Sequence, residues 1–325
     1  MPPLIYSTVL ITKDRPVQAQ RMLDQVTAQS FPPVRMLIVD ASTPPLVLDE
    51  KRVALAREVG IDILLLHESP SMPAQRNRGI DLVKTPVTLI LDDDVILPRE
   101  YMERLLASWE ARGLEALGGA VGARRPGPQD PPGPDVAERV IRRLFFLHDM
   151  VPQGMGTTLR RSGKFRKVPI PAKDVLVPVF ENGAVAFRTD LLRKHRFDEQ
   201  FTGYVYGEDL DLSGRLARDA PILHTPTTWY IHDWAPEGRA NDQMWYRRSR
   251  HEAYFRLRLI DRSPRTMAAF GLSVAAELAG ATREAARSRS LGSVRAYLRG
   301  LRETVKAVRS ERCSAAESGK GTSSV

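Results

Sequence analysis

Three consecutive aspartates, Asp92, Asp93 and Asp94, follow directly after the apolar run VTLIL. In open α/β sheets, ligands bind in the crevice beyond the carboxyl ends of the strands. Adjacent carboxylates repel one another unless water or a cation neutralises them, and hard ions such as Mg²⁺ or Mn²⁺ take carboxylate oxygens together with substrate phosphates. The triplet therefore indicates either a divalent-metal site or a solvated acidic turn before the helix expected near Pro98.

Two further groups have side chains that could complete such a site. Glu208 and Asp209 open an expected helix after GYVYG. Capping of the helix would explain them, but a carboxylate beside a proton donor can also act as a general base. His232 follows TTWYI; such a histidine is commonly structural, yet imidazole can join carboxylates around a metal ion. The residue types alone leave both interpretations open.

Alternating strand and helix patterns in the first third of the chain must position these groups. Short apolar or β-branched runs predict strands, and apolar residues spaced along one face predict the helices between them. Strands of this kind joined by helices predict an α/β fold with a mostly parallel sheet covered on both faces. The expected strands are 4–11, 34–39, 61–66 and 87–91, and the expected helices begin near Asp14, Pro73 and Pro98.

The pattern breaks in the middle of the chain. The segment 124–135 has five prolines in twelve residues and cannot form regular structure. A short helix is expected at 136–150, followed by a loop rich in glycine and cations. Long loops within compact domains are often functional, so 124–173 is predicted to be a mobile insertion. Strands and helices are expected again between residues 177 and 232.

The net charge of +9 lies entirely in the last part of the chain. Residues 1–235 contain 30 basic and 30 acidic side chains, whereas residues 236–325 contain 18 basic and 9 acidic ones. This difference predicts an anionic partner, although solvated helices alone would also explain it. A helix here would carry an apolar seam flanked by cations, which could lie on an anionic membrane or pack against another helix. The seam residues are Leu291, Val294, Leu298, Leu301, Val305 and Val308.

Several protein classes can be set aside. Cys313 is the only cysteine, which excludes an internal disulfide and a cysteine-based zinc site. The first residues lack the pattern of a secretion signal, and no run is long enough to span a bilayer. We therefore expect a cytoplasmic protein, located in solution or peripherally on the cytoplasmic face of a membrane. No GxGxxG follows a strand and no GxxxxGK[ST] occurs, which excludes a dinucleotide dehydrogenase and a P-loop NTPase.

Five segments, taken in order, resemble the family 2 glycosyltransferases of the GT-A fold. They are ITKDRP, LIVDAS, PAQRNRGI, LDDDV and ENGAVAFRTDLL with the following FDEQFTGYVYGEDLDLSGRL. The resemblance covers about Leu4 to His232 and implies an inverting, hexosyltransferase-type enzyme that uses a nucleotide-sugar donor and Mn²⁺ or Mg²⁺. It places a catalytic domain at 1–235, before a basic helical region at 236–312 and a disordered tail at 313–325.

The resemblance also implies roles for individual residues. Asp209 takes the place of the catalytic base, with Glu208 beside it. Asp92 and Asp94 match the two acids of the DxD motif, with Asp94 the direct metal ligand, and His232 matches a histidine that completes the metal shell in some members. The residues implied to bind the donor are Thr12, Arg15, Asp40, Arg76, Asn77, Asp92 and Asp93.

The substrate expectations are broader. UDP-linked donors lead, with dTDP-linked and GDP-linked donors as alternatives, and the acceptor is expected to be a glycan or a lipid-linked molecule of cell-envelope polysaccharide synthesis. No nucleic-acid partner is expected. A nucleotidyltransferase of related fold, or a non-catalytic basic scaffold that binds a membrane or nucleic acid, remains the alternative function.

Overall fold

The computed structural model describes most of the chain. The described residues are 4–127, 136, 140, 144–145, 149–150, 158–159, 161–167, 170–180, 183–201, 207–233 and 244–320. Most of the insertion predicted at 124–173, and most of the helix expected at 136–150, lie outside these ranges. The last five residues of the predicted tail also lie outside them.

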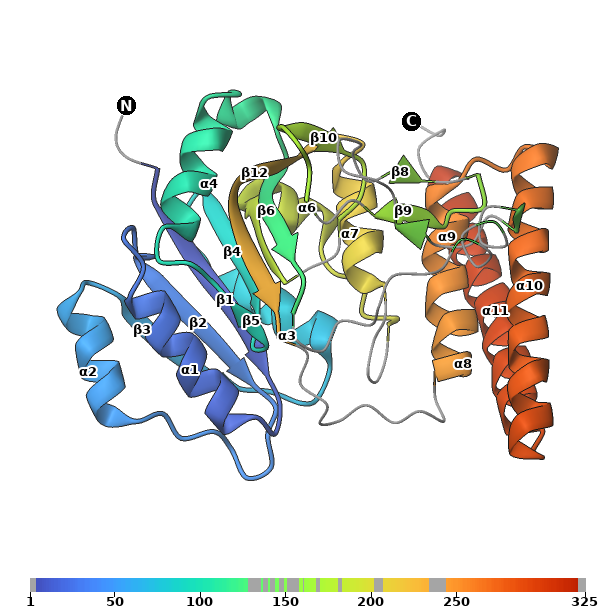
Figure 1. Ribbon diagram of the computed structural model, residues 1–325, viewed down its shortest axis with the longest axis horizontal. Helices are drawn as coiled ribbons and strands as arrows, with labels where there is room; N and C mark the ends of the chain where they lie inside the picture. Colours follow the sequence, from blue (N-terminus) through green and yellow to red (C-terminus); the bar gives the residue numbers. More distant parts are fainter. Residues whose placement is uncertain are drawn as a thin grey trace.

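Nine strands of the described part form one central sheet, in the order β10-β12-β6-β11-β4-β1-β2-β3 with β5 paired to β12. Helices cover both faces (Figure 1). The prediction of an α/β fold with helices on both faces is confirmed. The strands are β1 (Tyr6–Thr12), β2 (Arg35–Asp40), β3 (Asp62–His67), β4 (Val87–Asp92), β5 (Val95–Ile96), β6 (Gly119–Arg125), β10 (Val175–Val177), β11 (Ala184–Arg188) and β12 (Ile222–His232).

The helices of this region connect the strands in sequence. Each begins close to the position that the sequence predicts, except α2, which the sequence analysis did not identify. A short 3₁₀ turn, η1 (Leu114–Ala116), precedes β6. The α-helices are α1 (Pro16–Thr27), α2 (Glu50–Glu58), α3 (Met72–Leu82), α4 (Tyr101–Glu110), α6 (Thr189–His195) and α7 (Glu208–Leu216).

β1 lies between two parallel strands, and the ends of these three strands form the edge of the sheet where a ligand crevice is expected. β1 pairs in parallel with β2 on one side and with β4 on the other. Its register places Thr12 opposite Asp40 and Ile11 opposite Asp92. The polar ends of three neighbouring strands therefore meet at one edge of the sheet, where ligands of such folds bind.

The other half of the sheet is mixed rather than parallel. β11 runs antiparallel between β4 and β6, whereas β12 runs parallel to β6. The far end of β12 also pairs with β5, with His232 opposite Val95. This pairing brings His232 beside the turn that follows β4.

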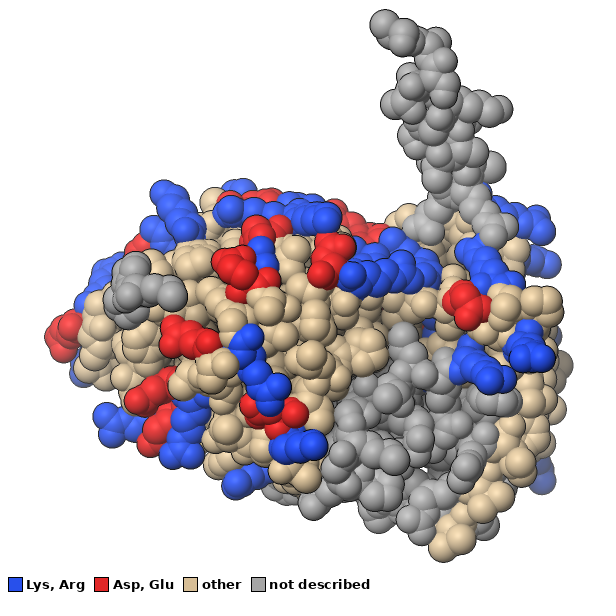
Figure 2. Space-filling view, turned by 90° about the horizontal axis from the view of Figure 1, so that it is seen from above, with Lys and Arg blue, Asp and Glu red and all other residues tan. Residues whose placement is uncertain are grey.

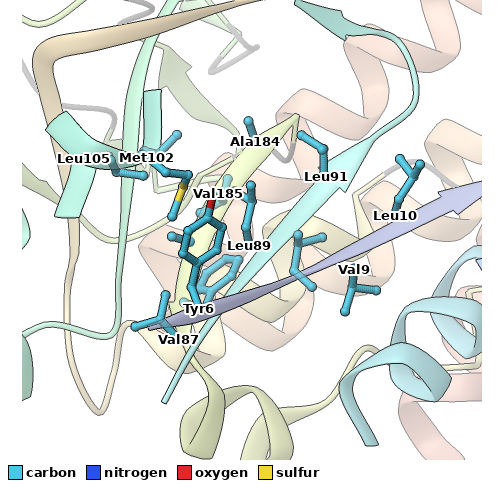
Figure 3. Packing of buried hydrophobic residues seen from close by; sticks show 14 of the residues in the cluster. Tyr6, Val9, Leu10, Val87, Leu89, Leu91, Met102, Leu105, Ala184 and Val185 are labelled. Atoms are coloured by element: carbon cyan, nitrogen blue, oxygen red, sulfur yellow. The ribbon is translucent and has the colours of Figure 1, made fainter. Parts of the chain in front are cut away.

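The main hydrophobic core lies between the sheet and its helices. Tyr6, Leu89 and Val185 come from three neighbouring strands and are almost completely buried. Met102 and Leu105 of α4 lie against the same layer (Figure 3). Burial of these apolar side chains is the main favourable contribution to folding, and it fixes the strand ends that carry the polar residues.

A separate group of helices follows the sheet. It consists of α8 (Met244–Arg247), a π-helical turn η3 (Arg248–Glu252), α9 (Ala253–Leu259), α10 (Pro264–Ser288) and α11 (Gly292–Lys320). These helices stand together at one side of the sheet, at the right of Figure 1. α11 extends to Lys320, into the segment that we expected to be a disordered tail. None of the described helices is long and apolar enough to cross a membrane.

α9 connects the two parts of the molecule because it packs directly on α7. Gly207, at the N-cap of α7, has φ +96°, and a Cβ atom there would lie 2.5 Å from the Phe255 ring of α9. Arg258 of α9 forms ion pairs with Asp198 at 2.5 Å and with Asp211 of α7 at 3.3 Å. The C-terminal helices are thus attached to the helix that begins with Glu208 and Asp209.

Part of the segment predicted to be mobile is buried against these helices. Lys164, 5% exposed, forms ion pairs with Glu252 of η3 and with Glu277 of α10, the latter at 2.5 Å. Glu277 also accepts a hydrogen bond from Tyr297 of α11 at 2.9 Å, and Arg256 lies 3.4 Å from it. Lys164 therefore pairs directly with acids of η3 and α10, and Glu277 extends this network to α11. A small sheet of β7 (Asp149–Met150), β8 (Thr158–Leu159) and β9 (Phe165–Lys167) lies nearby in the sequence.

Candidate active site

Arg76 joins the two acidic motifs at the edge of the sheet. It lies on α3, is 1% exposed, and donates to Asp92 at the end of β4 at 2.9 Å and to Glu208 at the start of α7 at 2.6 Å. Burial opposes the charge of this guanidinium, but the carboxylates of Asp92 and Glu208 outweigh burial and raise the pKa of Arg76. Two motifs far apart in the sequence are therefore held together by one buried cation.

Asp94 and His232 form a second pair. The ring Nε2 of His232 lies 2.8 Å from Oδ1 of Asp94, and the backbone N–H of Asp233 donates to the Asp94 carbonyl at 2.7 Å. Burial works against protonation of this imidazole, but the neighbouring carboxylates, Asp94 first, raise the pKa of His232. The end of β12 is thus attached to the acidic turn by both side chain and backbone.

Asp92, Asp94 and His232 together have the donor set of a metal site. Their candidate ligand atoms all lie within 4.8 Å of one another. Two carboxylates and one imidazole suit Mn²⁺ or Mg²⁺, which accept oxygen ligands with an added nitrogen. The residues present therefore fit a divalent cation.

Asp93 faces the loop after β1 rather than this group. It accepts hydrogen bonds from Thr12 Oγ1 at 2.8 Å and from Arg15 at 2.9 Å. Burial raises the pKa of Asp93 to about 6, against the opposing effect of Arg15. Arg15 also lies 3.6 Å from Asp94, so the first loop and the acidic turn are joined at two points.

Asp209 occupies the first turn of α7, beside Glu208. Its Oδ1 accepts the backbone N–H of Leu210 at 2.8 Å, and the side chain is partly exposed whereas Glu208 is 4% exposed. Glu208 is engaged by Arg76, as described above. Of the two adjacent acids, Asp209 is therefore the one that solvent can reach.

Asp40, at the end of β2, is held by four donors. Its Oδ1 accepts from the backbone and hydroxyl of Ser42, at 3.0 and 2.5 Å, and its Oδ2 from the Leu46 backbone at 2.8 Å. The His67 ring lies 3.1 Å from Oδ2. Burial of Asp40 favours the neutral form, but these hydrogen bonds outweigh it and lower the pKa.

A hollow of about 330 Å³ opens beside Asp40 at the ends of β2 and β3. His67 forms part of its wall, and the contact with the Asp40 carboxylate positions the His67 ring. The remaining lining residues are Ala41, Thr43, Glu68, Ser69 and Pro70. The sequence analysis had not identified His67, although its place directly after the third strand could have indicated it.

The two neighbours of Arg76 on α3, Gln75 and Asn77, form hydrogen bonds with other segments. Asn77 donates to Glu199 at 2.8 Å and to the Phe197 carbonyl at 2.9 Å, and it accepts the Phe197 N–H. Gln75, also absent from the sequence analysis, donates to the carbonyls of Thr12 at 3.2 Å and Val39 at 2.8 Å. Gln75 thus joins the ends of β1 and β2, whereas the amide of Asn77 is engaged by the segment after α6.

Fold and site together define a GT-A type transferase, with acidic motifs at the edge of a central sheet. The same architecture occurs in Staphylococcus aureus TarS residues 1–349, with TM-score 0.57, 13% identity, and coverage of 94% of this chain and 81% of that one. It also occurs in the mannosyltransferase PcManGT from Pyrobaculum calidifontis, with TM-score 0.50, 15% identity, and coverage of 92% and 84%. These similarities confirm the predicted fold.

Residues 7–194 match the family model of glycosyl transferase family 2, more than half of the 325 residues. The chain therefore belongs to glycosyl transferase family 2 and is a nucleotide-sugar dependent glycosyltransferase, as the five sequence segments had indicated. A search of curated protein sequences found no match.

Proposed function

We propose that the chain is an inverting glycosyltransferase in which Asp209 is the catalytic base. The observation that supports this most is the pairing of Arg76 with Asp92 and Glu208. Arg76 holds the acidic turn, which would bind the donor diphosphate, next to Asp209, the partly exposed acid of α7. Donor and acceptor groups would then meet between these two motifs.

In the proposed reaction, Asp209 takes the proton of an acceptor hydroxyl as its oxygen attacks the anomeric carbon. The bond between that carbon and the diphosphate oxygen breaks, and the electron pair leaves with the nucleoside diphosphate. Attack from the face opposite the leaving group inverts the anomeric configuration. Glu208, neutralised by Arg76, would hold the first turn of α7 in place.

Asp92, Asp94 and His232 would hold the divalent ion, whose chemistry when bound is to neutralise charge on a diphosphate. Thr12 and Arg15 would position the first loop through Asp93. The solved structures of PcManGT with GDP-Man and Mn²⁺ and of TarS with UDP-GlcNAc support a donor of this kind. The assignment of the ion as Mn²⁺ or Mg²⁺ belongs to the proposal.

The hollow beside His67 is the proposed site of the nucleotide base. Asp40 would act there through the His67 ring and the Ser42 loop. We propose UDP as the leading nucleotide, with dTDP and GDP as alternatives. A thermal-shift series with these diphosphates, each with and without Mn²⁺, would identify the base by a metal-dependent rise in Tm.

The proposed acceptor is a hydroxyl of a glycan or of a lipid-linked glycan, and the proposed location is the cytoplasm or the cytoplasmic face of a membrane. The basic C-terminal region supports a membrane-borne acceptor. Nucleic acid is not proposed as a partner, because the family membership provides an enzymatic role for the acidic motifs.

The substitution Asp209→Asn tests the base. We expect turnover to fall at least about 10²-fold while donor affinity stays unchanged, because general-base catalysis typically contributes about 10²–10⁴-fold. The matched control is Asp190→Asn, an exposed aspartate in the first turn of α6, which should leave turnover unchanged. Near-normal turnover in Asp209→Asn would remove Asp209 from this role.

Metal removal tests the second part of the proposal. EDTA should abolish sugar transfer, and added Mn²⁺ or Mg²⁺ should restore it. Full transfer in EDTA would contradict the metal site at Asp92, Asp94 and His232.

A further inference from the structure

Between residues 291 and 310, the outer face of α11 combines apolar and cationic side chains. Leu291, Leu298 and Val305 are 59%, 50% and 46% exposed and recur every seven residues. In this stretch five cationic residues are exposed, and the one acid, Glu303, accepts a hydrogen bond from Tyr246 at 2.5 Å, with its side chain 40% exposed. These cations are Arg295, Arg299, Arg302, Lys306 and Arg309.

The opposite face of α11 accounts for its packing within the protein. Tyr297 and Thr304 are almost fully buried, and Gly300 lies so close to α8 and η3 that a Cβ atom would be 2.7 Å from the Tyr246 carbonyl and 2.9 Å from the Arg250 backbone nitrogen. Thr304 donates to the Ser249 carbonyl at 2.8 Å. The apolar residues of the outer face are therefore not needed to hold α11 in the fold.

We propose that the outer face of α11 is a docking surface for an anionic lipid bilayer. Leucine and valine side chains in the centre of a cationic helix face can enter the headgroup boundary, while arginines contact acidic headgroups. At the right of Figure 2, the end of the molecule that carries the C-terminal helices shows Lys and Arg side chains and few acidic ones. The charge of this face is complementary to such a membrane.

The same residues argue against two other occupants. A second copy of α11 would bring the five cations against the same five cations, with Glu303, which is engaged by Tyr246, as the one acid of positions 291–310, and juxtaposed like charges weaken association. A nucleic acid would pair with the arginines but would leave Leu298 and Val305 without an apolar partner. An anionic bilayer uses both kinds of side chain.

This inference deepens the membrane-borne acceptor of the proposed function and rests on it for its biological purpose, but the binding itself needs neither donor nor metal. The surface would hold the enzyme beside a lipid-linked acceptor and raise the local concentration of that acceptor. Transfer to a soluble acceptor would not require it.

The test measures sedimentation of the full-length protein with vesicles of phosphatidylcholine and phosphatidylglycerol, in the absence of donor. We expect binding that weakens with salt and is lost on vesicles of phosphatidylcholine alone. The double variant Leu298→Gln/Arg302→Glu should bind at least about tenfold more weakly, because each cation near an anionic surface contributes about a fivefold factor. The matched control is Leu55→Gln/Arg57→Glu on α2, where Leu55 is 52% exposed; it should bind like the wild type.

Equal binding by wild type and the α11 variant, or no binding by the wild type, would overturn the proposal. So would a dimer in analytical ultracentrifugation that the α11 variant disrupts, or duplex binding that Leu298→Gln leaves unchanged together with no vesicle binding. Unchanged circular dichroism melting of both variants verifies their folding. Because transfer to a soluble acceptor is assayed separately, a wild-type protein that transfers sugar normally but does not bind vesicles would refute the surface and leave the proposed function intact.

Discussion

The sheet region and the C-terminal helices both bury charged side chains, but they arrange them differently. At the sheet edge, Arg76 pairs with acids on two separate elements, and one of these acids, Asp92, lies in the candidate metal cluster with Asp94 and His232. In the helices, Lys164 and Glu277 pair with each other deep between three elements. Buried ion pairs contribute little net stability but are costly to break. The first arrangement shapes a site, and the second fixes how elements pack.

The contact between α7 and α9 is where these two regions depend on each other. α7 carries the proposed base, and α9 supplies Phe255 and Arg258 to its surface. Loss of this contact should affect the sheet region as well as the helices. The following predictions test that dependence.

The substitution Gly207→Ala should have the largest effect. A side chain at φ +96° is strained, and its Cβ would meet the Phe255 ring, so we expect the free energy of unfolding to fall by about 4 kcal/mol. Urea unfolding measures this change. The control is Gly271→Ala on α10, where no atom lies within 4 Å of the new Cβ and a gain of about 0.5–1 kcal/mol is expected. Equal effects at both glycines would show that α9 does not constrain α7.

The substitution Arg258→Met should have the next largest effect. It leaves Asp211, which is 0% exposed, with Arg215 as its remaining cation. We expect a loss of about 3 kcal/mol in the free energy of unfolding, because the buried Asp211 carboxylate loses one of its two cationic partners. Arg287→Met, at an exposed position of α10, should change stability by less than about 0.5 kcal/mol. A loss in Arg258→Met no larger than in this control would contradict the role of the ion pair.

Mild acid should loosen the C-terminal helices through His251. Burial, with Arg250 and Arg247 nearby, lowers the pKa of His251 to about 4, and the ring packs against Phe201 and Tyr246. The folded state therefore disfavours the protonated ring. The stabilising contribution is complete above the unfolded pKa of about 6.5 and decreases as the pH falls toward 4, by about 2 kcal/mol at pH 5.

The variant His251→Phe keeps the aromatic contacts and removes the titrating group. As the pH falls from 7 to 5, the free energy of unfolding of the wild type should decrease relative to that of the variant. Above pH 7 the free energy of unfolding of each protein should change less. A constant difference across this range would exclude His251 as a source of acid sensitivity.

Much of the sheet region could be predicted because its strands are short apolar runs with polar residues at their ends. The family resemblance implied one metal site of Asp92, Asp94 and His232, and their candidate ligand atoms do lie together. β6 was missed because GAVGARR contains glycines that hide its apolar pattern. Gly122 is required there, since a Cβ atom would lie 2.9 Å from Tyr101 and Thr228.

Long-range partners could not be predicted from the residues alone. Arg76 and Glu208 are 132 positions apart, and the His67 ring beside Asp40 comes from another strand, 27 positions away. Of the predicted apolar seam, Val308 packs against the core of the C-terminal helices, whereas Leu298 and Val305 are exposed, so the main packing face of α11 is a different one. Tyr297, Gly300 and Thr304 form that face because glycine allows close approach to η3. A close contact between two helix backbones, such as that at Gly300, leaves no hydrophobic pattern in the sequence.

The bridge made by Arg76 has a consequence for catalysis. Its two ion pairs, together with the packing of its guanidinium 5.0 Å from the centre of the Phe197 ring, set the spacing between the acidic turn and α7 through contacts within the protein itself. A pocket assembled in advance needs no binding free energy to order its own side chains. The affinity for the sugar nucleotide then reflects the contacts it makes, and the first turnover should start without a lag.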